Sequence, residues 1–381
     1  MSENKVNAFS PTISPAPKSI SSDEIESIYE GLKFYFSLGI KELVLQKKYM
    51  GSYCDIYLHK EISESYFISR NGHKISYIDQ DEAISACTYI HNQFDWSDKK
   101  LIIIQSELMP WSALGEGLID NEFNAYLATQ KRHHDYLSSS NLYDKIELVK
   151  NGDTFIDYVD DQNKMTNKEL RSKYPNHILR QYGSLKDIRI LDLKMHQKGI
   201  QRYEDQIDHY GKKASLTFEA FNILKIIYQN GREEIPNDNL SYNVVNQINC
   251  ESIKLNSEED ILLNANILQE WFEKLRQDKE EGIMIKPRRA FIKNIPPALK
   301  VRNNDYLTMI YGVHFFDEMD YNIKRRKIGR KLRCSTNDWM INWELLKIPY
   351  HSINEENYFY KNLLLDRIDG EFIENKLDFR L

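Results

Sequence analysis

The stretch LVLQKKYMGSYCDIYL, residues 43–58, decides the fold that the sequence predicts. Its two ends, 43–45 and 54–58, are rich in the aliphatic, β-branched and aromatic residues that favour strands. The polar loop between them contains Gly51, and a glycine lets a phosphate group approach the backbone closely. Lys48 stands where the first strand gives way to this loop and can project into a cleft. The loop alone favours a solvated turn, because lysines are common in exposed turns.

Strand patterns continue beyond this stretch and then give way to helical ones. Residues 66–68 and 75–78 flank Asn71-Gly72, a dipeptide typical of two-residue hairpin turns. The apolar run 101–104 predicts a buried strand. From about 115 to 275 helical periodicity dominates, including 203–229, and short strands return at 282–285, 299–301 and 307–311. We therefore expect an α+β fold built on mainly antiparallel sheets.

Five segments are expected along the chain. Residues 1–20 are rich in Ser, Pro and Asn and predict a mobile arm. A first helix should begin near Ser21, where Ser21 and Glu24 fit a capping box, and end at Gly39. The remaining boundaries place the first part of the core at 21–114, a mostly helical insertion at 115–275, the second part of the core at 276–320, and a helical C-terminal module at 321–381.

The composition limits the class of protein. The chain has 381 residues, of which 28% are charged, and a net charge of −6. No apolar run approaches the roughly 18 residues that a membrane span requires, and the N-terminus has no signal-peptide pattern. The four cysteines lie far apart, which argues against zinc and against a disulfide framework. We expect a cytoplasmic protein with no membrane partner.

Basic residues are concentrated in two places near the C-terminal end. The net negative charge does not exclude a nucleic-acid partner, since local basic surfaces release counterions from phosphates. The second run directly follows the predicted core and predicts contact with an RNA backbone, although a solvated helix face is the alternative. The candidate RNA-binding residues in this run are Lys324, Arg325, Arg326, Lys327 and Arg330. Trp339 and Trp343, four residues apart, are expected in the core of the C-terminal helices.

Two later strands carry charges suited to phosphate chemistry. Glu281 and Lys286 stand at opposite ends of a short apolar run. Lys300 and Arg302 should share one strand face by period-two alternation and form a clamp for a triphosphate. An edge strand with protective charges is the alternative for this pair.

Taken in order, these segments resemble the motifs of the covalent nucleotidyltransferases, the superfamily of ATP-dependent DNA and RNA ligases and mRNA capping enzymes. The sequence KYMGS, 48–52, is similar to motif I (KxxG), and RNG, 70–72, to motif Ia. The sequences ELMPWS (107–112), EGIMIKP (281–287) and KVR (300–302) are similar to motifs III, IV and V. The Met-Gly-Ser form and ELMPWS resemble most the ligase (adenylyltransferase) domain of bacterial polynucleotide kinase-phosphatase. The resemblance covers about residues 25–350.

The resemblance implies an ATP-dependent RNA ligase of RNA repair that joins 5′-phosphate to 3′-hydroxyl ends. Lys48 would be the catalytic nucleophile that carries AMP, and Glu281 would help to place Mg²⁺, or Mn²⁺ in its stead. The residues expected to bind ATP or AMP are Lys47, Tyr49, Met50, Gly51, Ser52, Arg70, Glu107, Lys286, Lys300 and Arg302. The sequence after 320 lacks the strand pattern of an OB fold, which disfavours DNA ligases and capping enzymes.

Two departures from the family pattern leave alternatives open. Tyr53 stands where the family usually has Arg, a residue expected to support the steps after lysine adenylylation. The chain also has no room for kinase and phosphatase domains and no P-loop sequence, so a separate end-healing kinase/phosphatase or an RNA methyltransferase is an expected partner. The alternatives are an adenylyltransferase that seals only with a partner protein, and a non-catalytic RNA- or nucleotide-binding module of the same fold.

Overall fold

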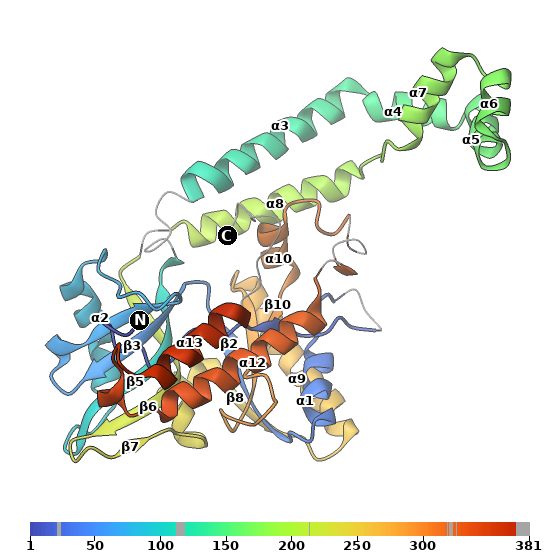
Figure 1. Ribbon diagram of the computed structural model, residues 1–381. Helices are drawn as coiled ribbons and strands as arrows, with labels where there is room; N and C mark the ends of the chain where they lie inside the picture. Colours follow the sequence, from blue (N-terminus) through green and yellow to red (C-terminus); the bar gives the residue numbers. More distant parts are fainter. Residues whose placement is uncertain are drawn as a thin grey trace.

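Two five-stranded sheets form the centre of the molecule (Figure 1). The computed structural model describes residues 1–20, 24–111, 119–212, 214–317, 319, 323–324 and 326–370. Helices pack around both sheets, and the strands within each sheet are almost all antiparallel. The predicted α+β class is confirmed.

The first sheet has the order β1-β10-β9-β2-β8. Its strands are β1 (Ser14–Pro15), β10 (Leu299–Arg302), β9 (Gly282–Pro287), β2 (Glu42–Lys48) and β8 (Cys250–Lys254). Helices α1 (Ile28–Ser37) and α9 (Glu258–Gln277) cover one face of this sheet. Leu32 and Phe272 from these helices pack with Ile285 of β9, which anchors the strand that carries the predicted motif IV.

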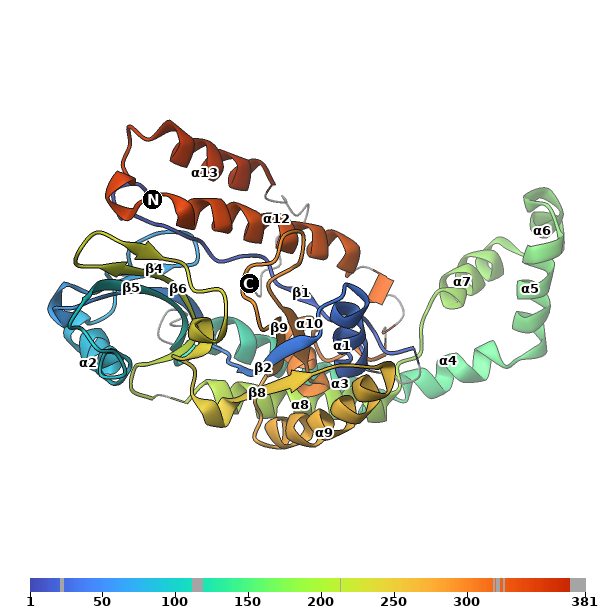
Figure 2. The ribbon, with the colours of Figure 1, turned by 90° about the horizontal axis from the view of Figure 1, so that it is seen from below.

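The second sheet has the order β4-β3-β5-β6-β7. Its strands are β4 (Tyr66–Ser69), β3 (Ser52–His59), β5 (Lys99–Met109), β6 (Thr217–Tyr228) and β7 (Glu233–Glu234). Helix α2 (Gln80–His91) packs on one face, and α12 (Ile328–Lys347) packs on the other. Helix α13 (Tyr358–Gly370) lies beside α12, as Figure 2 shows.

A helical arm projects from this body (Figure 1). Two long helices, α3 (Asn124–Ser140) and α8 (Leu193–Tyr210), run side by side and pack at their base on α10 (Asn304–Tyr311). Four short helices stand at the tip: α4 (Leu142–Lys150), α5 (Asp153–Lys164), α6 (Asn167–Lys173) and α7 (Asn176–Lys186). The stretch predicted to be mostly helical, 115–275, contains these helices and α9, but also the strands β6 and β8.

Two secondary-structure predictions around the insertion are wrong. Residues 217–228 form β6, the central partner of β5, although 203–229 had helical periodicity. The apolar residues of β6 are so dense that both periods fit them, and pairing with β5 decides the outcome. Residues 307–311 belong to α10, whose N-cap Asn303 accepts a hydrogen bond from the Tyr306 backbone N–H.

The N-terminal segment is packed, so the prediction of a mobile arm is wrong. Val6, Ala8 and Phe9 are buried, and β1 pairs in parallel with β10. The Asn7 side chain donates a hydrogen bond to the carbonyl of Leu345 in α12, 2.7 Å away. The segment runs beside α12 (Figure 2). Its few apolar residues are stabilised by partners more than 300 residues distant.

Smaller predictions had mixed outcomes. Ser21 lies outside the described residues; α1 begins at Ile28 and is followed by Gly39, whose φ of +80° suits the end of a helix. Asn71-Gly72 does reverse the chain, but β4 is followed by a single bridge from Ile68 to Lys74 and no second strand. Trp339 is buried against sheet β4–β7 and Trp343 packs beside it, which confirms their core assignment.

Candidate active site

Lys48 lies at the junction of the two sheets. It is the last residue of β2, and the chain crosses to the second sheet within three residues, because β3 begins at Ser52. Its ammonium lies 2.6 Å from the Glu281 carboxylate, which β9 presents beside Gly282, the β-ladder partner of Lys48. The Lys48 side chain is 22% exposed and that of Glu281 3% exposed. The lysine therefore faces an open space, while its carboxylate partner lies beneath it.

Gly51 is required by close packing. A Cβ at this position would lie 2.4 Å from the Leu108 carbonyl oxygen, 2.6 Å from Met109 Sδ and 2.7 Å from Glu107 Cγ. All three atoms belong to β5, so the loop after Lys48 lies directly on that strand. The Gly51 backbone N–H donates to the Glu107 carboxylate at 3.1 Å. This contact positions the loop and the carboxylate together.

A cavity of about 870 Å³ opens between the sheets beside Lys48. Its volume falls in the range of small-molecule sites. Nine of the predicted site residues line it: Lys47, Lys48, Tyr49, Gly51, Ser52, Arg70, Glu107, Lys286 and Lys300. Met50 instead packs among apolar residues at the base of the helical arm, and Glu281 lies below Lys48. The structure thus collects residues from both ends of the sequence around one cavity.

Two lysines bring positive charge to the cavity wall. Lys286 donates to the Gln46 side-chain oxygen at 2.5 Å, and its ammonium lies 4.6 Å from the centroid of the Phe221 ring. Burial lowers the pKa of Lys286 to about 7. Burial also lowers the pKa of Lys300 well below its usual range, and the nearby charges of Arg302 and Lys48 lower it further. An anionic ligand would restore the charged form of both lysines, since it offsets their desolvation.

The carboxyl groups of Glu107 and Glu281 both lie near Lys48. Burial raises the pKa of Glu107 to about 7; Lys48 opposes this shift and Glu281 adds to it. A hard divalent cation binds oxygen ligands of this kind. The carboxyl groups beside Lys48 are therefore chemically suited to a divalent cation, although Glu281 is paired with Lys48 in this structure.

Arg302 does not join Lys300 in a clamp, and that prediction is wrong. The Arg302 guanidinium is buried and lies 2.6 Å from the Glu26 carboxylate. Arg326 binds the same carboxylate at 2.5 Å. Although burial raises the pKa of Glu26, the two arginines hold it below its usual value. Arg302 therefore connects β10 to the segment that precedes α1, and it is not among the described residues that line the cavity.

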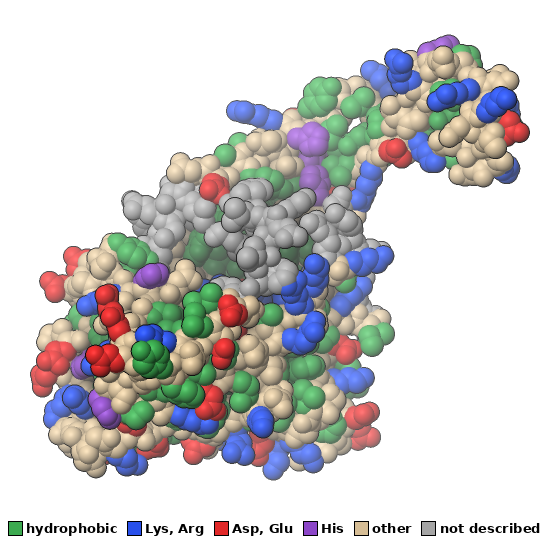
Figure 3. Space-filling model, in the orientation of Figure 1, with side chains coloured by type: hydrophobic (Ala, Val, Ile, Leu, Met, Phe, Trp, Pro, Cys, Tyr) green, Lys and Arg blue, Asp and Glu red, His purple; other side chains and the backbone are tan. Residues whose placement is uncertain are grey.

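The residues of the predicted RNA-binding run also differ in their exposure. Arg326 is 5% exposed and bound to Glu26, so its assignment to an RNA-binding surface is wrong. Lys324 and Lys327 are exposed, Arg330 is half-buried, and Arg325 lies outside the described residues. Lys and Arg side chains gather on the surface near the beginning of α12 (Figure 3).

Several further residues line the cavity that were not among the predicted site residues. Tyr53 lines the cavity; its hydroxyl donates to the Asp55 carboxylate at 2.7 Å and accepts from the Gln105 amide at 2.8 Å. Phe221 and Asn222 also line the cavity, and both come from β6. The expectation of a helix at 203–229 hid both residues. Regular alternation along a strand would have found only one of them, because they are adjacent and stand at a register shift between β5 and β6.

Comparisons with known proteins decide the family. The family model described as "PNKP adenylyltransferase domain, ligase domain" matches residues 3–352. The chain belongs to this family of ligase domains. The resemblance seen in the motifs is confirmed, and the protein is an adenylyltransferase of the RNA-repair ligase class.

Solved structures agree with this ligase-domain assignment. "Structure of Pnkp1/Rnl/Hen1 complex" contains a chain of 50% identity and TM-score 0.88, with all of this chain and 96% of that chain covered. "Structure of the Pnkp1/Rnl/Hen1 RNA repair complex" gives 50% identity and TM-score 0.87, with the same coverage. Curated protein sequences give no match. Among the described residues, the ligase domain has no helix long and apolar enough to cross a membrane.

Proposed function

We propose that this ligase takes AMP from ATP on Lys48 and passes it to RNA ends during repair. The observation that supports this most strongly is the position of Lys48. It is held by a carboxylate at the mouth of a nucleotide-sized cavity, with Lys286 and Lys300 on the cavity wall. A nucleophilic amine, phosphate-binding cations and carboxylates are the groups that adenylyl transfer requires.

The first step would be attack by the Lys48 amine on the α-phosphorus of ATP. The new N–P bond forms as the bond from the α-phosphorus to the bridging oxygen breaks, and pyrophosphate leaves with that electron pair. The Lys48 nitrogen loses its protons to solvent or to a neighbouring carboxylate. Lys286 and Lys300 would stabilise the charge that develops on the phosphate oxygens, an effect usually large in phosphoryl transfer.

The other cavity residues would hold the nucleotide. Arg70 and Glu107 line the cavity and would bind the ribose hydroxyls; Lys47, Tyr49 and Ser52 line it beside the nucleophile. Glu281 would hold Mg²⁺ (or Mn²⁺), which when bound supplies positive charge against the phosphates.

The later steps would use RNA with 5′-phosphate and 3′-hydroxyl ends. AMP moves from Lys48 to the 5′-phosphate, and the 3′-hydroxyl then displaces it. Lys324 and Lys327 are exposed cations that could contact the RNA backbone. The matched structures are of a three-protein repair complex, and Tyr53 replaces the expected arginine. We therefore propose that sealing depends on partner proteins that heal or methylate RNA ends.

The test is the intact mass of the protein after incubation with ATP and magnesium. We expect an added AMP moiety in the wild type, none in Lys48→Ala, and a normal adduct in Lys254→Ala. Lys254 is the matched control because it is exposed on β8 and lies outside the cavity lining. An unmodified wild type that still binds ATP would instead support the non-catalytic alternative.

Sealing is tested separately with the adenylylated protein. Nicked duplex RNA and single-stranded RNA are offered to it, alone and with the partner proteins. Sealing by the isolated chain would contradict the proposed need for partners, whereas adenylylation without sealing would support it.

A further inference from the structure

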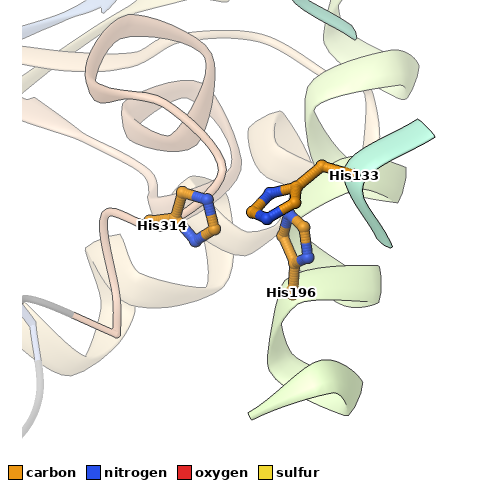
Figure 4. A group of neighbouring side chains, drawn as sticks. All are labelled: His133, His196 and His314. Carbon is orange, nitrogen blue, oxygen red and sulfur yellow. The ribbon is translucent and has the colours of Figure 1, made fainter. Parts of the chain in front are cut away.

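A cluster of histidines lies where α3 and α8 meet the loop after α10, and its members do not line the cavity. His133 comes from α3, His196 from α8, and His314 from the loop after α10. One ring nitrogen from each lies within 4.8 Å of the others. Figure 4 shows the three rings facing one another, and Figure 3 shows histidine side chains reaching the surface between the two long helices.

The buried atoms of this cluster lack hydrogen-bond partners. His196 has no exposed surface, and its Nδ1 has no partner among the described residues. Nδ1 of His314 and Oδ2 of Asp317 also have no hydrogen-bond partner among those residues; they lie 3.6 Å apart and form an ion pair when His314 is protonated. Buried acceptors that converge without a donor are costly, and a cation between them would satisfy several at once.

The remaining contacts of the rings support this orientation. Nε2 of His196 and Nε2 of His314 each lie 3.2 Å from the Gln130 side-chain oxygen. With the Gln130 amide in this orientation its oxygen accepts from both Nε2 atoms, which leaves a lone pair on each Nδ1. A second hydrogen bond that fixes the tautomer is typical of histidines that ligate metals.

We propose that His133, His196 and His314 bind a zinc ion that joins the helical arm to the nucleotidyltransferase core. Three histidines and one open position form a common zinc site, and a water or Asp317 would complete the tetrahedron. Nitrogens in such a site lie about 3.4 Å apart, because Zn–N bonds measure about 2.0 to 2.1 Å. To reach this spacing the exposed His133 side chain must rotate, and the rings of His196 and His314, which stack with centroids 4.5 Å apart, must tilt toward the ion. The cysteine spacing argued against zinc, but these histidines are separated by 63 and 118 positions in the sequence.

The site would connect three elements that also meet through the Lys131–Glu204 ion pair and the hydrogen bond from the Val313 N–H to the Tyr126 hydroxyl. Gly199 of α8 lies against the Val313 carbonyl, where a Cβ would approach to 2.2 Å. His314 is the next residue, so a metal here would fix α8 and α3 to the segment that follows α10. This role is independent of AMP transfer and of the magnesium ion expected at Glu281.

The test uses the full chain, stripped of metal with a chelator that is then removed. Zinc is titrated by calorimetry, and cobalt by its visible absorption, which reports tetrahedral coordination. We expect one ion per chain, no competition by excess magnesium, and at least about tenfold weaker binding in His133→Gln and His314→Gln. His177→Gln is the matched control, because His177 is exposed on α7 at the tip of the arm.

His133→Gln is the decisive variant, since His133 is exposed and its loss leaves the packing intact. In the wild type, zinc should raise the melting temperature and slow amide exchange in α3 and α8. Absence of tight zinc binding in the wild type would overturn the proposal. Unchanged zinc affinity in both His133→Gln and His314→Gln would overturn it as well.

Discussion

Substitution of Gly51 by alanine tests the packing that positions the nucleophile. The new Cβ would lie 2.4 Å from the Leu108 carbonyl oxygen and 2.6 Å from Met109 Sδ. The backbone oxygen cannot rotate away, so the loop must move off β5. Overpacking of this kind costs about 1 to 3 kcal/mol. The movement would also lengthen the 3.1 Å hydrogen bond from Gly51 to Glu107.

The displacement carries Lys48 with it, because Lys48 is only three residues away. A shift of about 1 Å at a reacting group can slow a reaction about a hundredfold. We expect Gly51→Ala to unfold at lower urea concentration and to accept AMP about a hundredfold more slowly, as followed by intact mass over time. Gly329→Ala is the control: no atom lies within 4 Å of its added Cβ, and stability should stay the same or rise by up to about 1 kcal/mol. Wild-type stability and rate in Gly51→Ala would refute the reasoning.

Three further predictions concern buried charges. Burial raises the pKa of Asp55 from 3.8 to about 8, so the stability that protonated Asp55 contributes is complete below about pH 4 and is lost as the pH rises to 8. In urea unfolding from pH 5 to 8, Asp55→Asn should remove this loss of stability, which amounts to up to about 1.4 kcal/mol per pH unit. Lys225 is 1% exposed and contacts Asn7, the Leu346 and Ile348 carbonyls and Glu233. Lys225→Met should therefore lower the free energy of unfolding by about 3 to 5 kcal/mol, whereas the control Lys254→Met, at an exposed position, should lower it by less than about 0.5 kcal/mol. Glu26→Gln should also cost about 3 to 5 kcal/mol, because it leaves Arg302 and Arg326 buried without a carboxylate, and a loss below 1 kcal/mol would contradict this.

Local patterns predicted the strands that carry the active site. The runs at 43–45, 54–58, 101–104 and 282–285 all lie in strands, since each is short, apolar and bounded by turn or polar residues. The sequence also indicated Lys48 and Gly51, because a loop with a lysine and a glycine between two strands is followed, in the order of the family motifs, by strands that carry phosphate-binding charges.

Long-range contacts account for what the sequence could not predict. Lys300 and Arg302 do occupy alternate positions of β10, but Arg302 binds the carboxylate of Glu26, which lies 276 positions earlier in the sequence. Arg326 belongs to a run that reads as a basic surface, and the same carboxylate buries it. The N-terminal segment has a disordered composition, yet its backbone and side chains bond to α12. No pattern within one segment reveals a partner hundreds of residues away.

The most direct test of the central claim is the location of the AMP. The protein is incubated with ATP and magnesium, digested, and its peptides are sequenced by tandem mass spectrometry. We expect AMP on the peptide that contains Lys48, with fragment ions that assign it to Lys48 and not to the adjacent Lys47. AMP at any other residue, or an adduct that persists in Lys48→Ala, would contradict the account.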